Sequence, residues 1–356
     1  MIISRTPFRI SFFGGGTDYP SWFRTHGGAV LGAAIDKYCY LTCRYLPPFF
    51  EHRFRIVYSK IEDRVAVADI EHPAVRTVLQ FLGVTRGVEI HHDGDLPARS
   101  GMGSSSAFTV GLLHVLHALK GQMVSRQQLA EEAIHVEQGL LRETVGCQDQ
   151  ILAAYGGLNH ISFLQNGTFS VRPVPLSASR VQELNEHLML FYTGIQRTAS
   201  QVADSYVSHL EERRRHLRII KDLVDEGLSV LSSGGSLVAF GELLHEAWEA
   251  KRSLSHMVSN DYVDELYAAA RSAGAIGGKL TGAGGGGFLL LFVTPDARTS
   301  VRNRLNRLIH VPMSVASTGS QIVFFDREHE YAEEHAARDR QLSDACRPLS
   351  TCLGPS

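Results

Sequence analysis

The sequence predicts a mixed α and β protein in two parts that divide near residue 180. Strand-like and helix-like patterns alternate along most of the 356 residues, and 44% of the residues are hydrophobic, which suffices for one large core or two ordinary ones. The composition shifts after Pro175, and the residues beyond about 328 are polar. We therefore expect domains over residues 1–180 and 181–328, followed by a terminal extension over 329–356.

In the first part, strands are expected over residues 8–13, 38–45 and 87–92, and helices over 104–119 and 125–141. Alternation in the first strand puts Arg9 and Ser11 on the face opposite its apolar residues. Ser125, three residues before Gln128, has the spacing that caps the start of a helix. In the second part, strands are expected over 188–192, 288–293 and 321–326, and helices over 200–231 and 297–309.

The composition argues against several classes of protein. The chain has 35 Lys and Arg against 37 Asp and Glu, so no excess of positive charge favours nucleic acid. The longest apolar run covers only residues 288–293, and the N-terminus lacks the apolar segment of a signal peptide, so we expect a cytoplasmic protein without a membrane span. Five cysteines without a Cys-x-x-Cys pair predict neither a disulfide framework nor a zinc knuckle. The sequence leaves a homo-oligomer open.

Glycine is unevenly distributed. The 33 glycines cluster at residues 14–16, 101–103 and 282–287. Glycine is favoured where the backbone takes positive φ or closely approaches a ligand. Three separated clusters therefore predict one site that is assembled from distant segments.

The second cluster runs directly into a predicted helix. Free backbone N–H groups and the helix dipole at such a start bind anions, and serine hydroxyls add donors for phosphate or a ligand for Mg²⁺. The alternative is a helix cap of small residues without a ligand. The segment is not a Walker A loop, and although Gly282, Gly284 and Gly287 have dinucleotide-fingerprint spacing, a strand follows them instead of preceding them.

Two carboxylates are candidates for chemistry. Glu137 falls within the apolar arc of the helix that Ser125 would cap, where a carboxylate is costly unless it is paired or binds a metal. Asp149 follows that helix, before the apolar pair Ile151 and Leu152. Periodicity alone equally allows Glu137 at the edge of a polar face and Asp149 as a capping residue.

The three glycine segments resemble the motifs of the GHMP kinase superfamily in order, at residues 7–19, 100–107 and 279–287. The resemblance implies an α+β fold with an N-terminal half like ribosomal S5 domain 2 and a C-terminal ferredoxin-like half. Within the family, the triple glycine before Thr17, residues 35–38 and residues 191–194 resemble bacterial D-glycero-D-manno-heptose 7-phosphate kinases.

The resemblance implies an ATP and Mg²⁺ site. It assigns the ATP phosphates to the second segment, at Arg99, Gly101, Met102, Gly103, Ser104, Ser105 and Ser106. It assigns Mg²⁺ to Ser105 and Glu137. It puts Asp149 beside the acceptor hydroxyl and Arg9 near the transferring phosphoryl group, as catalytic residues.

The resemblance also implies a sugar site. It assigns sugar contacts to the residues that surround the first and third glycine clusters: Gly15, Gly16, Thr17, Asp18, Tyr19, Gly282, Gly284 and Gly285. The candidates for a distant phosphate on the sugar are Lys37, Arg99, Arg197 and Lys279, each of which could instead be a surface charge.

One departure from the family narrows the substrate. Galactokinases carry Glu-His where this chain has Gly15-Gly16, which leaves room for a bulkier, phosphorylated sugar. We therefore expect an ATP-dependent kinase that phosphorylates D-glycero-D-manno-heptose 7-phosphate at its anomeric hydroxyl. A kinase for another sugar or sugar phosphate, or a ligand sensor without catalysis, are the alternatives.

Overall fold

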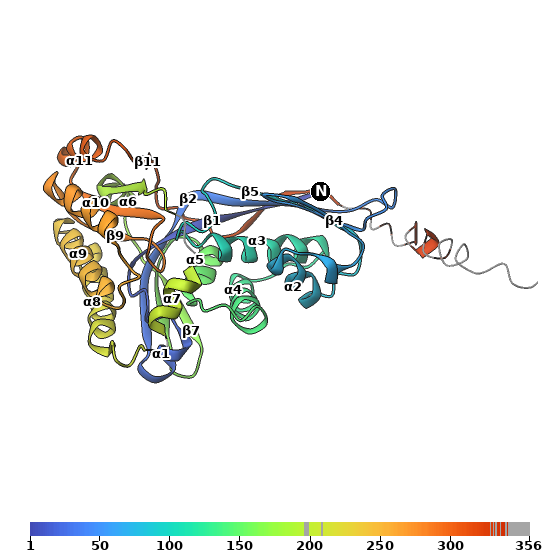
Figure 1. Cartoon of the computed structure of the whole chain (residues 1–356), viewed down its shortest axis with the longest axis horizontal. Helices are drawn as coiled ribbons and strands as arrows, with labels where there is room; N and C mark the ends of the chain where they lie inside the picture. Colours follow the sequence, from blue (N-terminus) through green and yellow to red (C-terminus); the bar gives the residue numbers. More distant parts are fainter. Residues whose placement is uncertain are drawn as a thin grey trace, which may run out of the picture.

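The computed structural model describes residues 1–195, 199–207, 209–327, 329, 331, 333, 334, 336–338 and 340. Arg197, one of the expected phosphate ligands, and most of the expected terminal extension lie outside these residues. The described chain forms an eight-stranded sheet and a four-stranded sheet, and helices pack against both (Figure 1).

The larger sheet is built mainly from the first half of the chain. Its strand order is β12-β1-β2-β5-β3-β4, and β6 and β7 extend from β2. The strands are β1 (Ile2–Phe13), β2 (Gly28–Tyr45), β3 (Phe54–Val57), β4 (Ile61–Arg64), β5 (Val88–Gly94), β6 (Leu158–Phe163), β7 (Phe169–Pro173) and β12 (Gln321–Phe325). Strand β12 lies at the edge beside β1, so these residues, expected in the second domain, join the first sheet instead.

The helices of the first half lie on one side of this sheet (Figure 1). They are α1 (Pro20–His26), η1 (Val67–Asp69), α2 (Pro73–Phe81), α3 (Ser104–Leu119), α4 (Arg126–Ile134), η2 (His135–Leu140) and α5 (Gln148–Tyr155). The Ser125 hydroxyl accepts a hydrogen bond from the Gln128 N–H at 3.1 Å, which confirms the predicted cap of α4. The expected helix 125–141 changes after Ile134 into the π-helix η2.

The second half forms the smaller sheet, of order β11-β8-β10-β9, from β8 (Leu188–Tyr192), β9 (Ala275–Leu280), β10 (Phe288–Val293) and β11 (Ile309–Val311). Its helices are α6 (Ala178–His187), α7 (Ala199–Val207), α8 (Arg214–Ser232), α9 (Val238–Arg252), α10 (Asp261–Ser272), η3 (Pro295–Ala297) and α11 (Arg298–Arg304). The single helix expected over 200–231 is therefore two helices, and the one expected over 297–309 ends at Arg304.

The two halves meet along the end of β1. The rings of Phe12 and Phe13 pack edge-to-face on Phe240 of α9, at centroid distances of 5.3 and 5.0 Å. The Lys279 Nζ of β9 donates to the Phe12 carbonyl at 3.1 Å. Arg9 lies on the same strand, three residues before Phe12, so this junction fixes its position. In the described ranges, no helix has the length and apolar character that crossing a membrane requires.

Candidate active site

The three glycine segments meet in space, as the sequence predicted. The Arg9 N–H donates to the Met102 carbonyl at 3.1 Å, which joins the first segment to the second. A Cβ atom on Gly282 would lie 2.7 Å from the Gly101 Cα, and one on Gly287 would lie 2.1 Å from the Ser100 carbonyl oxygen. Only glycine fits where the second and third segments touch.

Arg9 and Asp149 form the ion pair at the centre of this junction. Arg9 donates from Nε to Asp149 Oδ1 at 2.7 Å and from Nη2 to Oδ2 at 2.6 Å, while Nη1 donates to the Gly101 carbonyl at 2.7 Å. Asp149 follows the helix that Ser125 caps, as expected, and lies in the first turn of the next helix, α5. A Cβ on Gly103 would come within 3.1 Å of Arg9 Cγ, so the loop glycine leaves room for this pair. Such a bidentate pair fixes both groups in orientation.

Glu137 lies fully buried in the π-helix η2, next to the start of α3. Its Oε2 accepts hydrogen bonds from the Ser106 hydroxyl at 2.8 Å and from the Gln150 amide. Among the described residues, its Oε1 has no hydrogen-bond partner. Burial raises the pKa of this carboxyl to about 7, although the Ser106 hydrogen bond opposes the shift. A cation would neutralise Glu137 and complete its bonding.

The serine whose hydroxyl contacts Glu137 is Ser106, whereas the motif pairs Ser105 with Glu137 as metal ligands, an assignment that stays a prediction. Ser106 is buried, whereas Ser105 is exposed. Successive residues of a helix point about 100° apart, so only one of the two can face η2. The motif predicted the segment. The rotation of α3 about its axis determines which serine hydroxyl faces the carboxylate of Glu137.

Asp18 anchors the first glycine turn to α5. Its Oδ1 accepts from the Gly16 N–H at 2.9 Å and its Oδ2 from the Gln148 N–H at 3.3 Å. Burial raises the pKa of Asp18, and the nearby charge of Asp149 adds to the effect. The sequence analysis predicted Asp18 in this site, and the structure brings it to the Arg9–Asp149 pair.

Two polar residues that the sequence analysis missed flank Gly15. A Cβ at Gly15 would lie 3.5 Å from both the Ser11 hydroxyl and the Gln148 Nε2. Ser11 Oγ and Gln148 Oε1 are buried, and within the described chain neither has a hydrogen-bond partner. Ser11 shares the strand face of Arg9, which was the signal that could have identified it. These atoms can bind hydroxyl groups of a ligand.

Lys251 is a further residue that the sequence analysis missed. It is buried on α9 and donates to the Gly282 carbonyl, next to the expected Lys279 of β9. Its spacing from Phe240 and Leu244 puts a lysine on the apolar face of α9, which was the available signal. Burial, with a contribution from the charge of Arg9, lowers the pKa of Lys251 to about 8, although Asp18 and Asp149 oppose the shift.

Other predicted residues shape the loops. Thr17 donates to the carbonyls of Gly14 and Ala29 at 2.8 and 2.9 Å, and the Gly285 N–H donates to the Val258 carbonyl at 2.8 Å. A Cβ on Gly284 would lie 2.5 Å from that same carbonyl oxygen. Tyr19 precedes α1, Met102 is buried in the core, and Ser104 begins α3.

Two predicted cations are not engaged at the ion pair. Arg99 is exposed and takes φ 58°, a left-handed conformation that is unusual for arginine. Lys37 donates to Asp36, at 3.1 Å to its carbonyl and 3.2 Å to its carboxylate. The structure therefore gives neither residue a contact with Arg9, Asp18 or Asp149.

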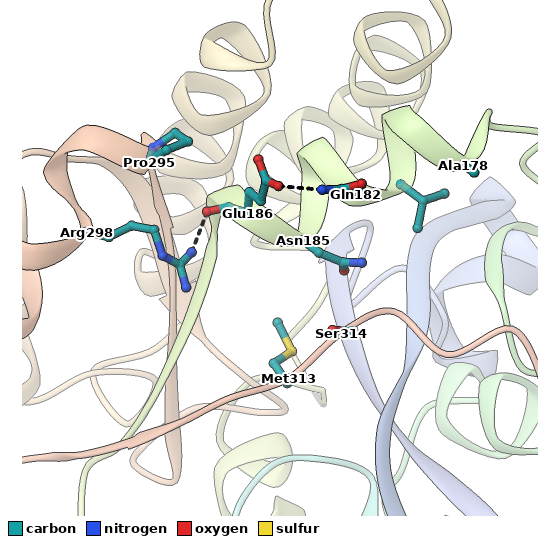
Figure 2. Close-up of a pocket in the computed structure, with 9 residues that line it drawn as sticks. Ala178, Gln182, Asn185, Glu186, Pro295, Arg298, Met313 and Ser314 are labelled. Atoms are coloured by element: carbon teal, nitrogen blue, oxygen red, sulfur yellow. Dashed lines mark hydrogen bonds between the residues drawn. The ribbon is translucent and has the colours of Figure 1, made fainter.

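A cavity of about 530 Å³ lies elsewhere, between α6, α11 and the chain at Met313 (Figure 2). Its polar side chains bind one another or the backbone: the Gln182 amide donates to Glu186 at 2.9 Å, and Arg298 donates to the Leu188 carbonyl at 2.9 Å. The junction around Arg9 and Asp149 has convergent glycine loops, buried charges and, nearby, polar atoms without a partner among the described residues. It is therefore the better candidate for chemistry.

Comparison with known proteins identifies the family of the chain. The model of the GHMP kinases N terminal domain matches residues 69–157, and that of the GHMP kinases C terminal domain matches residues 219–311. The chain is 26% identical over 317 residues to a D-glycero-alpha-D-manno-heptose 7-phosphate kinase of Campylobacter jejuni, covering 86% of this chain and 93% of that one. It is also 26% identical over 353 residues to a galactokinase of Roseiflexus sp., covering 87% and 88%.

Solved structures share the fold. A D-glycero-D-manno-heptose 1-phosphate kinase from Bacteroides thetaiotaomicron superposes with a TM-score of 0.76 at 23% identity, over 92% of this chain and all of that one. A Lactococcus lactis galactokinase complexed with galactose gives 0.71 at 19% identity, over 90% and 94%. The α+β fold of the GHMP kinases, which the motifs implied, is confirmed.

Proposed function

Because the chain belongs to the GHMP kinases, with sugar kinases among its relatives, we propose that it transfers the γ-phosphoryl group of ATP to D-glycero-D-manno-heptose 7-phosphate. The acceptor is the anomeric hydroxyl and the product is the 1,7-bisphosphate. The reaction would serve the synthesis of GDP-heptose for a capsule or surface polysaccharide, in the cytoplasm. The observation that carries the proposal is the Arg9–Asp149 ion pair, with Arg9 buried, against the Gly101–Gly103 loop.

GHMP kinases use ATP, and the start of α3 supplies what its phosphates need. The backbone N–H groups there and the positive end of the helix dipole favour phosphate. Ser106 and Glu137 would hold Mg²⁺, since the unpartnered Oε1 of Glu137 is an oxygen donor that lacks a counter-charge. When bound, the metal would offset charge on the phosphates.

Transfer then depends on two residues. Asp149, held by Arg9, accepts a hydrogen bond from the acceptor hydroxyl, orients its oxygen toward the γ-phosphorus and receives its proton as the new O–P bond forms. The bond from that phosphorus to the bridging oxygen of ADP breaks. Arg9 lies between Asp149 and the Gly101 carbonyl, where its charge stabilises the phosphoryl group in transit.

The acceptor site favours a polyhydroxy compound. Around Gly15, the Ser11 hydroxyl and the Gln148 amide present donors and acceptors that the protein leaves unpaired within its described residues. The two glycines of the turn leave space where galactokinases carry Glu-His. The relatives nevertheless include a galactokinase at the same 26% identity as the heptose 7-phosphate kinase, so another sugar is the second candidate.

ADP release in a coupled assay tests the proposal. Acceptors would be D-glycero-D-manno-heptose 7-phosphate, the same heptose without phosphate, galactose and L-fucose. We expect the highest kcat/KM with the 7-phosphate. A higher value with an unphosphorylated sugar would replace the substrate by that sugar, and no release with any sugar or sugar phosphate would favour a sensor.

A further inference from the structure

Two lysines from the second half of the chain are buried beside the ion pair. Lys251 of α9 and Lys279 of β9 are 5% and 3% exposed. Their ammonium groups donate to backbone carbonyls, Lys251 to Gly282 and Lys279 to Phe12 at 3.1 Å. In the part of the chain that the structure describes, neither forms a salt bridge. We call these two residues the lysine pair.

The nearby carboxylates already accept hydrogen bonds from other groups. Asp149 is held by two hydrogen bonds from Arg9, and Asp18 accepts from the N–H groups of Gly16 and Gln148. The lysine pair therefore adds two buried cations for which neutral carbonyls are the hydrogen-bond partners. Burial without a counter-ion is costly for an ammonium group. Burial lowers the pKa of Lys279 well below its usual value, and Lys251 and Arg9 lower it further.

The lysine pair contacts the backbone of two segments of the expected site. Lys279 reaches Phe12, two residues before the Gly14–Gly16 turn, where we place the acceptor. Lys251 reaches Gly282, which packs against Gly101 of the phosphate loop. The lysine pair thus contacts the backbone near the turn where we place the acceptor and next to the phosphate loop.

We propose that Lys251 and Lys279 form a subsite for a phosphate dianion that the acceptor carries, so that the lysine pair selects phosphorylated over unphosphorylated sugars. The inference rests on the proposed function, because it takes a sugar phosphate as acceptor. Two ammonium groups match the charge of a phosphate monoester, and each supplies donors to its oxygens. The transferring γ-phosphoryl group has the same chemistry and is the other source that could fill this subsite.

The test compares Lys251→Met and Lys279→Met with the full-length wild type. Methionine keeps the length of the side chain and removes its charge. Lys120→Met is the matched control, since Lys120 also donates to a backbone carbonyl, that of Leu82 at 2.9 Å, but is exposed at the end of α3. The kcat and KM of each protein are measured with the heptose 7-phosphate and with the unphosphorylated heptose.

We expect each pair variant to raise the KM for the 7-phosphate by about 10- to 100-fold, as for the loss of one charge-assisted hydrogen bond. The kcat/KM with unphosphorylated heptose should fall much less than that with the 7-phosphate, and Lys120→Met should resemble the wild type with both acceptors. Melting temperatures show whether each variant folds. If the Lys251→Met variant does not fold, Lys251→Gln takes its place.

Three outcomes would overturn the inference. An unchanged preference of the variants for the 7-phosphate would exclude the subsite. Equal losses with both acceptors, mainly in kcat, would assign the lysine pair to the γ-phosphoryl group of ATP. Loss of activity in Lys120→Met as well would show a nonspecific effect of charge. Failure of the proposed function itself would be visible earlier, as a wild type that does not use the 7-phosphate.

Discussion

The two ends of helix α3 both carry a buried polar cluster, but only one cluster is complete. At the C-terminal end, His117 bonds Glu132 at 2.7 Å and Gln122 at 3.0 Å, so both ring nitrogens have partners. At the N-terminal end, Ser106 and Gln150 bond one oxygen of Glu137, and the other has no partner among the described residues. A completed cluster holds the fold together, whereas an incomplete one is ready for a ligand.

The charges at the two ends differ in the same way. The Glu132 hydrogen bond raises the pKa of His117, and the His117 bond lowers that of Glu132 despite its burial, so each favours the charged form of the other. Burial instead raises the pKa of Glu137 to about 7, which means that the folded protein disfavours its charged form. At these two ends of α3, the polar groups are thus fully bonded where they support the structure, and one oxygen is left without a partner where we propose chemistry.

The largest expected effect is at the incomplete end. Asp149→Asn keeps the shape of the side chain but removes the negative charge that orients the acceptor hydroxyl. We expect kcat to fall by about 10²- to 10⁴-fold, the range for loss of a proton-transfer group. Calorimetric titration with a non-hydrolysable ATP analogue and Mg²⁺ should give the wild-type Kd. Turnover near the wild-type value would exclude the assigned role.

The next effect separates neighbouring hydroxyls. Ser106→Ala removes the group that contacts Glu137, whereas Ser105→Ala changes an exposed side chain. We expect Ser106→Ala to raise the Mg²⁺ concentration for half-maximal ADP release by about 10- to 100-fold, and Ser105→Ala to raise it much less. The reverse order would restore Ser105 as the metal serine.

A smaller effect is expected at the complete end, on stability alone. The raised pKa of His117 stabilises the fold below about pH 6.5 and this contribution is lost as the pH rises through the raised value, while the lowered pKa of Glu132 contributes above about pH 4.5 and is lost as the pH falls. Glu132→Gln should therefore cost about 1–3 kcal/mol, most between pH 5 and 6.5. Denaturant titrations across pH 4–9 check this, and a loss that does not change with pH would contradict the charged pair.

Local features of the structure could be predicted from the sequence. The bounds of α3, β8 and β10 follow from apolar periodicity, and the meeting of the glycine segments follows from motifs that need positive φ. The pairing of β12 with β1 could not be predicted, because it joins residues more than 300 positions apart and no local pattern records it.

The sequence predicted which residues come together in the site but not every contact between them. Arg9, Asp18, Glu137 and Asp149 occupy one region, as the motifs implied. The choice of Ser106 over Ser105 depended on the phase of α3 against η2, which the motif does not specify. Lys251 was missed because a lone lysine in a helix is usually exposed, although its position on the apolar face of α9 was visible in the sequence.

The most direct test of the contrast between the two ends is a pair of identical substitutions, Glu137→Gln and Glu132→Gln. Because the folded pKa of Glu137 is raised, its destabilising effect grows as the pH rises from 4.5 through about 7, so pH 7.5 reveals it. Melting temperature and ADP release would be measured for both variants at that pH. We expect Glu137→Gln to melt higher than the wild type and lose activity, and Glu132→Gln to melt lower and keep it. Both variants losing stability while keeping activity would contradict the account.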